Sequence, residues 1–273
     1  MRLVSWNLNR WQRREADRWA TLASFLRDLD VDVALLQETG PPEVAEDRFV
    51  YHRLSGLRAG QDYGTAVVAL NSALVFRPLA SAPADSHAES GQLWESHPGT
   101  IAAAEVKGAS GSLILVSVYG RMLQAGNGTT YASTTIHRVI SDLVPVLDPG
   151  PGAPRAVVAG DFNCTTQWDT RPLDRVMDRS VFARLEDFGL VNLLFEAASD
   201  SPPLADCFCP DAGTPDCLHT RTLRHRDKAD SRPYQVDYAF ANSSLRASAR
   251  VLASEAAWAL SDHAPVLVDL PTT

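Results

Sequence analysis

Residues 156–163 have the sequence AVVAGDFN, in which an apolar run ends at Gly160 and is followed by Asp161 and Asn163. Small and β-branched residues between turn-forming residues are typical of a strand that is buried on both faces. Side chains two positions apart on a strand point to the same side, so Asp161 and Asn163 should face one space while Phe162 turns back to the core. The same composition also fits a simple Asx turn that caps the strand.

The composition is that of a globular protein. The chain has 273 residues, of which 45% are hydrophobic and 21% are charged, and these proportions suit one large domain. Patches rich in proline and glycine, such as residues 149–154, are too short to be flexible linkers between domains. We therefore expect a single domain over residues 1–273.

The beginning of the chain enters a strand pattern without a charged leader or an apolar signal region, and no run is long enough to span a membrane. Four cysteines in a chain of this length do not form a disulfide scaffold, which suits a reducing compartment. We therefore expect a monomeric, cytoplasmic protein. The net charge of −8 argues against a generally basic surface, but a phosphate substrate is compatible with it if divalent cations lie between the acids and the phosphate.

Polar side chains recur where predicted strands begin or end. The set consists of Asn7, Glu38, Tyr119, Asp161, Asn163, Asp237, Asp262 and His263. Each has an ordinary interpretation when taken singly, as a turn former, a solvated strand end or a tyrosine at the edge of the core. Their recurrence favours a shared site. Carboxylate and carboxamide oxygens suit a hard cation such as Mg²⁺ or Mn²⁺, and the scarcity of Cys and His in the set disfavours zinc there.

Apolar stripes with helical spacing predict helices over residues 16–29 and 131–147, and a third from Pro172 to Gly189. Residues 64–70 and 74–76 have the pattern of paired strands. Strands therefore alternate with helices along the chain, which indicates a mixed fold.

Five motifs occur in the order and at the spacing of one known family. They are Trp6-Asn7, Gln37-Glu38, Gly160-Asp161-Phe162-Asn163, Val236-Asp237-Tyr238 and Ser261-Asp262-His263. With them the chain resembles the endonuclease/exonuclease/phosphatase superfamily, the DNase I-like metal-dependent phosphohydrolases, over nearly its whole length. The resemblance implies an α/β (α+β) fold, a four-layer sandwich of two packed mixed β-sheets flanked by helices.

The resemblance also implies roles for single residues. Glu38 would bind the catalytic Mg²⁺ or Mn²⁺, with Asn7 orienting or joining that site and Asp262 beside the metal or the leaving oxygen. Asp161 would orient or deprotonate the attacking water, and Asn163 would donate a hydrogen bond to a phosphate oxygen.

The remaining members of the set would act on the phosphate. His263 would contact the scissile phosphate, and Asp237 would fix the orientation of its imidazole. Tyr119 matches the exonuclease III and abasic-site endonuclease branch, and a phenol can donate to a phosphate oxygen or, when ionised, stabilise the leaving group. The chain departs from that branch at Asn9, where an acid is usual. It also lacks a recognisable aromatic abasic pocket in residues 199–232.

Arginines are the candidates for substrate phosphate contacts. Arg221, Arg224 and Arg226 make one loop basic in an acidic chain, and Arg121 follows Tyr119. Because the loop over residues 206–226 directly precedes the strand that carries Asp237, we expect it to lie beside the cleft and to set specificity.

The same loop contains Cys207, Cys209, Cys217 and His219. These C-x-C and C-x-H halves can place four ligands tetrahedrally around a structural Zn²⁺. The simpler interpretation is reduced thiols in a loop, or one disulfide.

The leading hypothesis is a Mg²⁺- or Mn²⁺-dependent phosphodiesterase or nuclease that acts on DNA, RNA or nucleotides. A phosphomonoesterase or a lipid-headgroup phosphodiesterase would share every catalytic residue and differ only in its loops. The non-enzyme alternative is a binding module that has lost the chemistry. Such loss shows first in the metal and phosphate ligands, and all of them are present here.

Overall fold

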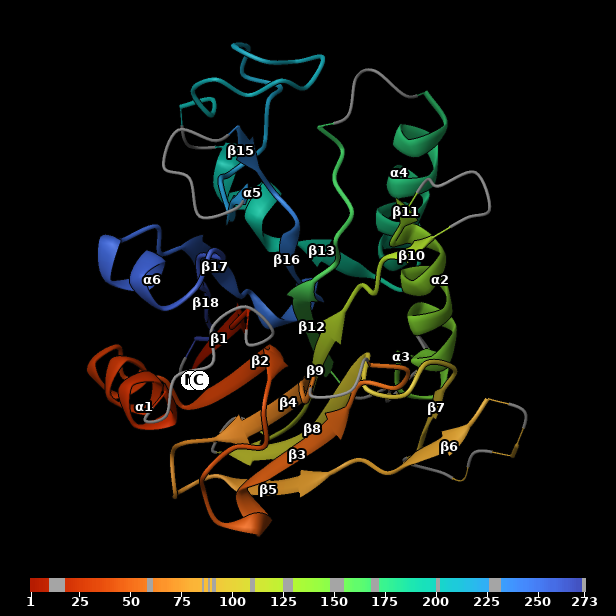
Figure 1. Ribbon diagram of the computed structural model, residues 1–273, viewed down its shortest axis with the longest axis vertical. Coiled ribbons are helices and arrows are strands. Elements are labelled where there is room, and N and C mark those ends of the chain that lie inside the picture. The colour runs from red at the N-terminus through yellow and green to blue at the C-terminus, as the bar shows by residue number, and fades with distance from the viewer. Residues whose placement is uncertain are drawn as a thin grey trace.

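Two mixed β-sheets pack face to face, and helices cover their outer faces (Figure 1). The computed structural model describes residues 1–9, 18–57, 61–84, 86–87, 89, 92–108, 111–124, 130–147, 155–167, 172–199, 202–225 and 232–271. Within this part of the chain, no helix is long and apolar enough to cross a membrane.

The first sheet has six strands in the order β17-β18-β1-β2-β4-β3. Its strands are β1 (Arg2–Asn7), β2 (Val33–Thr39), β3 (Phe49–Arg53), β4 (Gly64–Ala69), β17 (Ser248–Val251) and β18 (Val266–Asp269). Only β1 and β2 pair in parallel, and the other neighbours are antiparallel.

The second sheet also has six strands, in the order β13-β16-β12-β9-β8-β5. Its strands are β5 (Val75–Pro78), β8 (Ile101–Gly108), β9 (Gly111–Tyr119), β12 (Arg155–Asp161), β13 (Leu190–Asn192) and β16 (Asp237–Asn242). The central strand β12 pairs in parallel with β9 and antiparallel with β16. The strands come so close here that a Cβ on Gly160 would lie 1.9 Å from the carbonyl oxygen of Val118.

Three two-stranded ribbons and the helices complete the fold. The ribbons pair β6 (Ser81–Pro83) with β7 (Leu93–Glu95), β10 (Leu123–Gln124) with β11 (Thr130–Tyr131), and β14 (Leu223–Arg224) with β15 (Pro233–Tyr234). The α-helices are α1 (Arg18–Asp28), α2 (Ser133–Asp142), α3 (Val144–Leu147), α4 (Pro172–Asp187), α5 (Leu193–Ser199) and α6 (Glu255–Leu260), and single 3₁₀ turns span Glu46–Arg48 and Ser243–Leu245.

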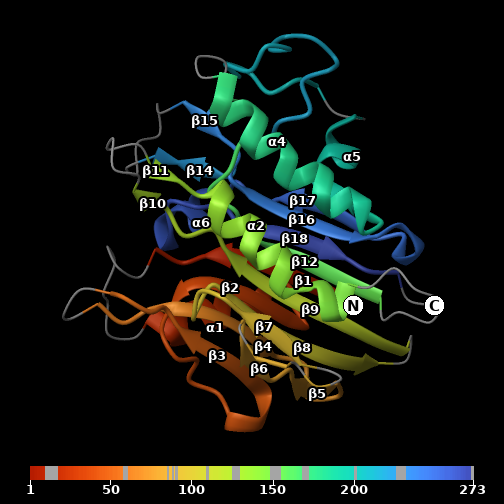
Figure 2. The same ribbon diagram turned by 90° about the vertical axis from the view of Figure 1, so that its right-hand side faces the viewer.

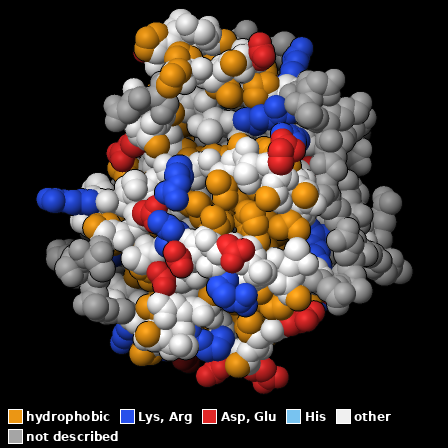
Figure 3. Space-filling view, turned by 90° about the vertical axis from the view of Figure 1, so that its left-hand side faces the viewer, with side chains coloured by type: hydrophobic (Ala, Val, Ile, Leu, Met, Phe, Trp, Pro, Cys, Tyr) orange, Lys and Arg blue, Asp and Glu red, His pale blue; other side chains and the backbone are white. Residues whose placement is uncertain are grey.

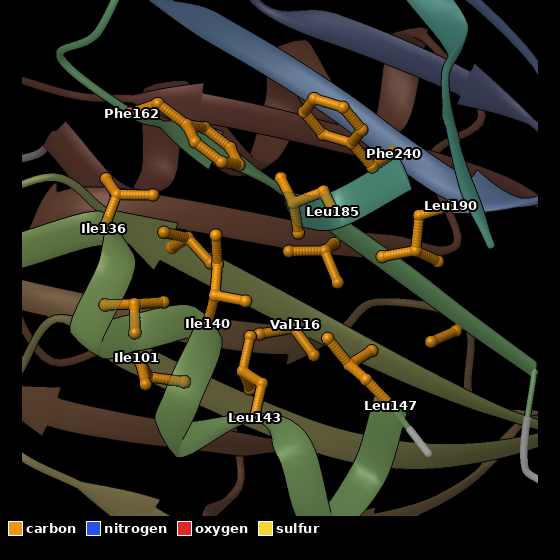
Figure 4. Close-up of a cluster of buried hydrophobic side chains, with 14 of the residues drawn as sticks. Ile101, Val116, Ile136, Ile140, Leu143, Leu147, Phe162, Leu185, Leu190 and Phe240 are labelled. Atoms are coloured by element: carbon orange, nitrogen blue, oxygen red, sulfur yellow. The ribbon is translucent and has the colours of Figure 1, made fainter. Parts of the chain in front are cut away.

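The alternation of side chains along the strands divides the core into three layers. Leu3 and Val157 lie between the sheets, whereas Trp6 packs outward in the cluster that includes residues of α1 and α6. On the far side, Phe162 packs in the cluster with Ile136 and other residues of α2 and α4 (Figure 4). Figure 2 shows α2 and α4 lying across that face. The predicted four-layer sandwich is therefore confirmed.

Two details of the sequence-based prediction are wrong. Residues 131–147 do not form one helix but the end of β11 followed by α2 and α3. Pro145 explains the break, because proline fits the first turn of a helix but removes a hydrogen bond and clashes in the interior of one. Residues 64–70 and 74–76 do form strands, but β4 belongs to the first sheet and β5 pairs with β8 in the second.

Candidate active site

Three polar side chains lie side by side in one row across the second sheet. The parallel register places Tyr119 beside Asp161, and the antiparallel register places Asp237 on the other side of Asp161. Side chains alternate between the two faces of a strand, and all three residues fall on the face that packs between the sheets, as Ala159 does. Their side chains therefore point into the space between the two sheets, where these strands begin or end.

The first sheet meets this row through β1 and β2. Asn7 Nδ2 donates to Asp161 Oδ2 at 2.8 Å, and the backbone N–H of Asn9 donates to Asn7 Oδ1 at 2.9 Å. At the adjacent position on β2, Gln37 Nε2 donates to Ser117 Oγ of the second sheet at 2.8 Å. Hydrogen bonds between buried polar groups thus fix the spacing of the two sheets at the site.

Glu38 reaches the site through a break in the strand. Because Gln37 points between the sheets, strict alternation would turn Glu38 to the outer face. The pairing of β2 with β4 shifts register between Leu36 and Thr39, and Glu38 has a φ of 46°. A bulge of this kind re-aims a side chain. The Tyr119 hydroxyl donates to Glu38 Oε1 at 2.9 Å, and Glu38 is only 7% exposed.

Asn163 and Asp161 form a compact turn at the end of β12. The backbone N–H of Asn163 donates to Asp161 Oδ1 at 2.8 Å, and its Nδ2 donates to Asp161 Oδ2 at 2.9 Å and to the Gly120 carbonyl at 3.0 Å. Phe162 turns back into the core as predicted. The turn interpretation and the shared-space interpretation of this stretch are therefore both correct.

His263 pairs with Asp237 across the site. Its Nδ1 lies 2.9 Å from Asp237 Oδ2 and 3.1 Å from Oδ1, which leaves Nε2 as the ring atom that can meet a substrate. Hydrogen bonds also fix the backbone of His263 and of the residues before it. The Ser261 hydroxyl donates to the Asn7 carbonyl at 2.7 Å and accepts from the His263 N–H at 3.1 Å, and the Trp6 indole donates to the His263 carbonyl at 2.8 Å.

The electrostatics of the site follow from burying several acids together. Burial raises the pKa of Glu38, and the charge on His263 partly opposes that rise. Burial also raises the pKa of Asp161 to about 8; His263 again opposes the rise, whereas Asp237 and Glu38 add to it. Burial alone would lower the pKa of His263, but Asp237 and the other nearby acids raise it to about 10. The site therefore holds a cationic imidazole among acids whose ionisation is costly.

Two buried carboxylate oxygens lack a hydrogen-bond partner within the described residues, Glu38 Oε2 and Asp262 Oδ1. In the same site, donor atoms of Asp161, Asp237 and His263 all lie within 4.8 Å of one another. Unpartnered carboxylate oxygens in a buried acidic site are the ligands that hard divalent cations prefer. The residues present therefore fit a divalent cation.

Comparison with known proteins identifies the family. A profile of the Endonuclease/Exonuclease/phosphatase family matches residues 4–263. This chain belongs to that family. Comparison with curated proteins found no match. Membership of the family supports metal-dependent hydrolysis of phosphoesters. It also confirms the resemblance that was inferred from the five sequence motifs.

Solved structures of low sequence identity share the fold. The AP endonuclease LMAP from Leishmania major is 16% identical with a TM-score of 0.65, and the match covers 100% of this chain and 88% of that one. The Xenopus laevis APE2 catalytic domain is 17% identical with a TM-score of 0.63, covering 99% and 91%. The endonuclease domain of TRAS1, a telomere-specific non-LTR retrotransposon, is 16% identical with a TM-score of 0.60, covering 100% and 99%.

In this member of the family, two of the predicted substrate-binding arginines lie together at the edge of the site. The backbone N–H of Arg224 donates to the Asp262 carbonyl at 2.8 Å, while its Nη2 bonds Glu255 Oε1 at 2.9 Å and its guanidinium lies 4.5 Å from the Trp258 ring. Burial lowers the pKa of Arg221, and the positive charge of Arg224 adds to the effect. Arg224 is thus already engaged by a side chain, Glu255, that is 87% exposed.

The third predicted arginine, Arg121, lies on the other side of the site. Its Nη1 donates to the Ser55 carbonyl at 3.0 Å, and its charge lowers the pKa of Tyr63, which burial and Glu38 raise overall. Arg226 lies outside the described residues. Phosphate binding by these arginines stays a prediction.

Sequence reasoning missed two residues that interact with the set, one by hydrogen bonding and one electrostatically. Thr222 Oγ1 accepts hydrogen bonds from the N–H groups of Val236 and Asp237, at 3.1 and 3.2 Å, and so holds the start of β16. Tyr63 lies close enough to Glu38 for their charges to interact. No motif singles out Thr222, and the only signal at Tyr63 is its place just before the predicted strand that begins at Gly64.

Proposed function

We propose that this chain is a single-domain, divalent-metal-dependent phosphodiesterase that hydrolyses phosphodiester bonds in nucleic acid or nucleotides. One observation carries the proposal. The strand ends of both sheets converge on a buried acidic site in which Glu38 Oε2 and Asp262 Oδ1 are unpartnered within the described residues, beside the His263–Asp237 pair. Such a site supplies metal ligands, a proton acceptor and a phosphate contact together.

Glu38 and Asp262 would hold the cation, Mg²⁺ or Mn²⁺, and Asn7 would support them. The bound cation would neutralise charge that develops on the phosphoryl oxygens. Asn7 contacts the Glu38 carboxylate and also donates to Asp161. It would therefore set the distance between the metal ligand and the proposed base.

Asp161 would orient and deprotonate the attacking water. Asn7 and Asn163 both donate to its carboxylate, which fixes its plane. Its pKa of about 8 lies close to neutral pH, where a general base works best. Asn163 Nδ2 is engaged with Asp161 and with Gly120, so a hydrogen bond to a phosphate oxygen would replace one of these two contacts.

His263 and Tyr119 would bind the phosphate as hydrogen-bond donors. Asp237 holds the imidazole in the cationic form, which allows Nε2–H to donate to a phosphate oxygen. Burial, followed by the charges of Glu38 and Asp161, raises the pKa of Tyr119 well above its ordinary value. The phenol therefore stays protonated at neutral pH, which favours donation over the ionised alternative. Because its single proton bonds Glu38 Oε1, donation to a phosphate oxygen would replace that contact.

The charge distribution favours a short or small substrate. On the face shown in Figure 3, basic and acidic side chains are interspersed among apolar ones. A long duplex would need a continuous basic track, whereas the chain as a whole has a net charge of −8. We therefore expect contacts to only a few phosphates, supplied by Arg121, Arg221 and Arg224.

The test is a substrate screen with the full chain. Phosphodiesters (DNA, RNA, cyclic and linear nucleotides, a glycerophosphodiester) and the matching phosphomonoesters would be assayed with Mg²⁺, with Mn²⁺ and with EDTA. We expect diester cleavage that EDTA abolishes and either cation restores. Asp161→Asn should be inactive, whereas Asp269→Asn, the same change in a surface ion pair on β18, should behave as wild type. Cleavage of monoesters alone, or full activity on diesters after chelation of the metal, would contradict the proposal.

A further inference from the structure

Four metal-competent side chains that do not belong to the catalytic set converge in the segment over residues 202–225. Donor atoms of Cys207, Cys209, Cys217 and His219 all lie within 4.8 Å of one another. The Sγ atoms of Cys209 and Cys217 are 3.7 Å apart, and His219 Nδ1 lies 3.8 Å from the Sγ atoms of Cys207 and Cys217. Figure 1 shows the loops that precede β14 above β15 and α5, at one end of the molecule.

These separations match the edges of a tetrahedral zinc site. With Zn–S bonds of about 2.3 Å and a Zn–N bond of about 2.0–2.1 Å, a tetrahedron has S···S edges of about 3.8 Å and S···N edges of about 3.6 Å. The observed separations of 3.7 and 3.8 Å lie close to both. A disulfide would bring two sulfurs to about 2.0 Å. All four cysteines of the chain are free, so the disulfide alternative is wrong.

The surrounding polar groups orient these side chains as ligands. Thr166 Oγ1 lies 2.7 Å from His219 Nε2, which leaves Nδ1 as the ring atom turned towards the sulfurs. Gln167 Nε2 donates to Cys207 Sγ at 3.4 Å. A hydrogen bond to the second ring nitrogen is how proteins fix the tautomer of a metal-binding histidine, and donation to sulfur favours the thiolate.

The stretch between Cys209 and Cys217 buries no side chain of its own. Residues 210–216 are all exposed, whereas Cys209 and Cys217 on either side of them are only 5% and 3% exposed. A short stretch without an apolar cluster of its own needs a cross-link to keep one conformation. Three soft sulfur ligands and one imidazole select zinc over Mg²⁺ or Mn²⁺.

Hydrogen bonds connect this cluster to the strand that carries Asp237. Gln167 Oε1 accepts from the Gln235 N–H at 2.7 Å, and its Nε2 donates to the Pro233 carbonyl at 2.7 Å. Thr222, three residues after His219, accepts the N–H of Asp237. The cluster therefore lies at one end of a continuous set of bonds that ends at the His263–Asp237 pair.

We propose that Cys207, Cys209, Cys217 and His219 bind a structural zinc ion, which fixes residues 202–225 against the strand ends of the active site. The proposal stands on the geometry of the cluster and does not depend on the substrate. Because zinc content and coordination are measured without hydrolysis, either this proposal or the proposed function can fail alone.

The first measurement uses the wild-type chain as purified. Elemental analysis should find about one zinc ion per chain, and X-ray absorption at the zinc edge should show three sulfurs at about 2.3 Å and one nitrogen at about 2.0–2.1 Å. Replacement of zinc by Co²⁺ should give thiolate-to-cobalt charge-transfer absorption and the d–d bands of a tetrahedral ion. None of these results depends on the folding of a variant.

Variants then locate the ion. Cys209→Ser and Cys217→Ser should lose the zinc, whereas Cys164→Ser, which removes another buried free thiol outside the cluster, should keep it. Asp161→Asn should also keep it, because the ion does not occupy the catalytic site. Limited proteolysis should cut within residues 202–225 of the zinc-free chain and spare the zinc-bound one.

Three results would overturn the proposal. The first is a wild-type chain with no zinc and no cobalt charge-transfer band, which would mean that the cluster is a set of reduced thiols. The second is an absorption edge with only oxygen and nitrogen neighbours. The third is zinc that survives in folded Cys209→Ser but disappears in Asp161→Asn, which would assign the ion to the catalytic acids.

Discussion

Replacing Asp237 with asparagine should change the charge state of His263. In the wild-type site both Asp237 oxygens lie within 3.1 Å of His263 Nδ1, and the pKa of His263 is about 10 instead of its ordinary 6.5. The difference corresponds to roughly 5 kcal/mol in favour of the imidazolium. Burial opposes this stabilisation, and Asp161 and Asp262 supply part of it, so about 5 kcal/mol is the net effect of all these groups and not the contribution of Asp237 alone.

Without that carboxylate, burial dominates and drives the imidazole towards its neutral form at pH 7.5. The asparagine amide can also donate to Nδ1, which would fix the opposite tautomer and leave Nε2 carrying the proton that Nδ1 loses. If the cationic ring is the phosphate donor, kcat should fall on the order of 10²–10⁴ at neutral pH.

The assay is a profile of kcat/KM between pH 5.5 and about 10 at saturating Mn²⁺, with the His263 ring followed by NMR. The wild type should show no loss from His263 until the pH approaches about 10, whereas Asp237→Asn should already have lost activity by about pH 6.5, because burial then lowers the pKa of the ring below its ordinary value. Asp269→Asn, which removes a carboxylate from the ion pairs with Arg2 and Arg250, is the matched control. A folded Asp237→Asn variant with the wild-type profile would refute the role given to the pair.

Three further predictions follow from the same site. Asn163→Ala should lower the single-turnover rate by a factor on the order of 10²–10³. The control is Asn163→Gly, because glycine adopts the φ of 48° without strain. If the side-chain amide is responsible and not the backbone conformation, Asn163→Gly should lose as much activity as Asn163→Ala. The metal-free chain should lose thermal stability as the pH rises. In the folded state the pKa of Asp161 (about 8) and that of His263 (about 10) lie above their ordinary values of 3.8 and 6.5. The stability that each group contributes is therefore complete below its ordinary pKa. It is lost as the pH rises through about 8 for Asp161 and through about 10 for His263. A flat Tm between pH 5 and 9 in EDTA would contradict this. Between 50 and 200 mM salt, substrate affinity should fall far less than the roughly 10³–10⁵-fold expected for long DNA. A steep salt dependence would instead indicate an extended nucleic-acid track. Arg121→Ala should raise KM more than it lowers kcat.

The strand ends of the second sheet could be predicted because two simple rules operate there. An apolar run bounded by glycine and proline marks a buried strand, and the period of two assigns Asp161 to one face and Phe162 to the other. The five motifs then indicated which strand ends carry the polar set. What they could not give was which strands are neighbours, because pairing of Asp161 with Tyr119 and with Asp237 is a matter of topology.

Features that depend on contacts distant in sequence were beyond prediction. The break in residues 131–147 is not one of these features, because the local effect of Pro145 on a helix interior accounts for it. Arg224 has no neighbour in sequence that would reveal its ion pair with Glu255, and Thr222 has no motif that links it to Asp237. In each case the partner is brought close by the fold and not by spacing.

Backbone strain shows where the site is assembled. Asn9, Glu38 and Asn163 all have positive φ values, and each lies at or just beyond the end of a different strand, β1, β2 or β12. The left-handed region costs an ordinary residue about 1–2 kcal/mol. Asn9 and Asn163 offset part of this through their N–H bonds to the side chains of Asn7 and Asp161.

Glu38 has no such local bond among the described residues, and its conformation is held by the bulge and by the hydroxyl of Tyr119 from the opposite sheet. If its backbone relaxed to regular strand geometry, alternation would carry the carboxylate to the outer face and withdraw the unpartnered Oε2 from between the sheets. Strain persists only where the surrounding structure over-determines it, and it gathers at functional sites. The position of the proposed metal ligand is therefore set by the main chain of β2 and not by a choice of rotamer, which pre-organises the site before a cation binds.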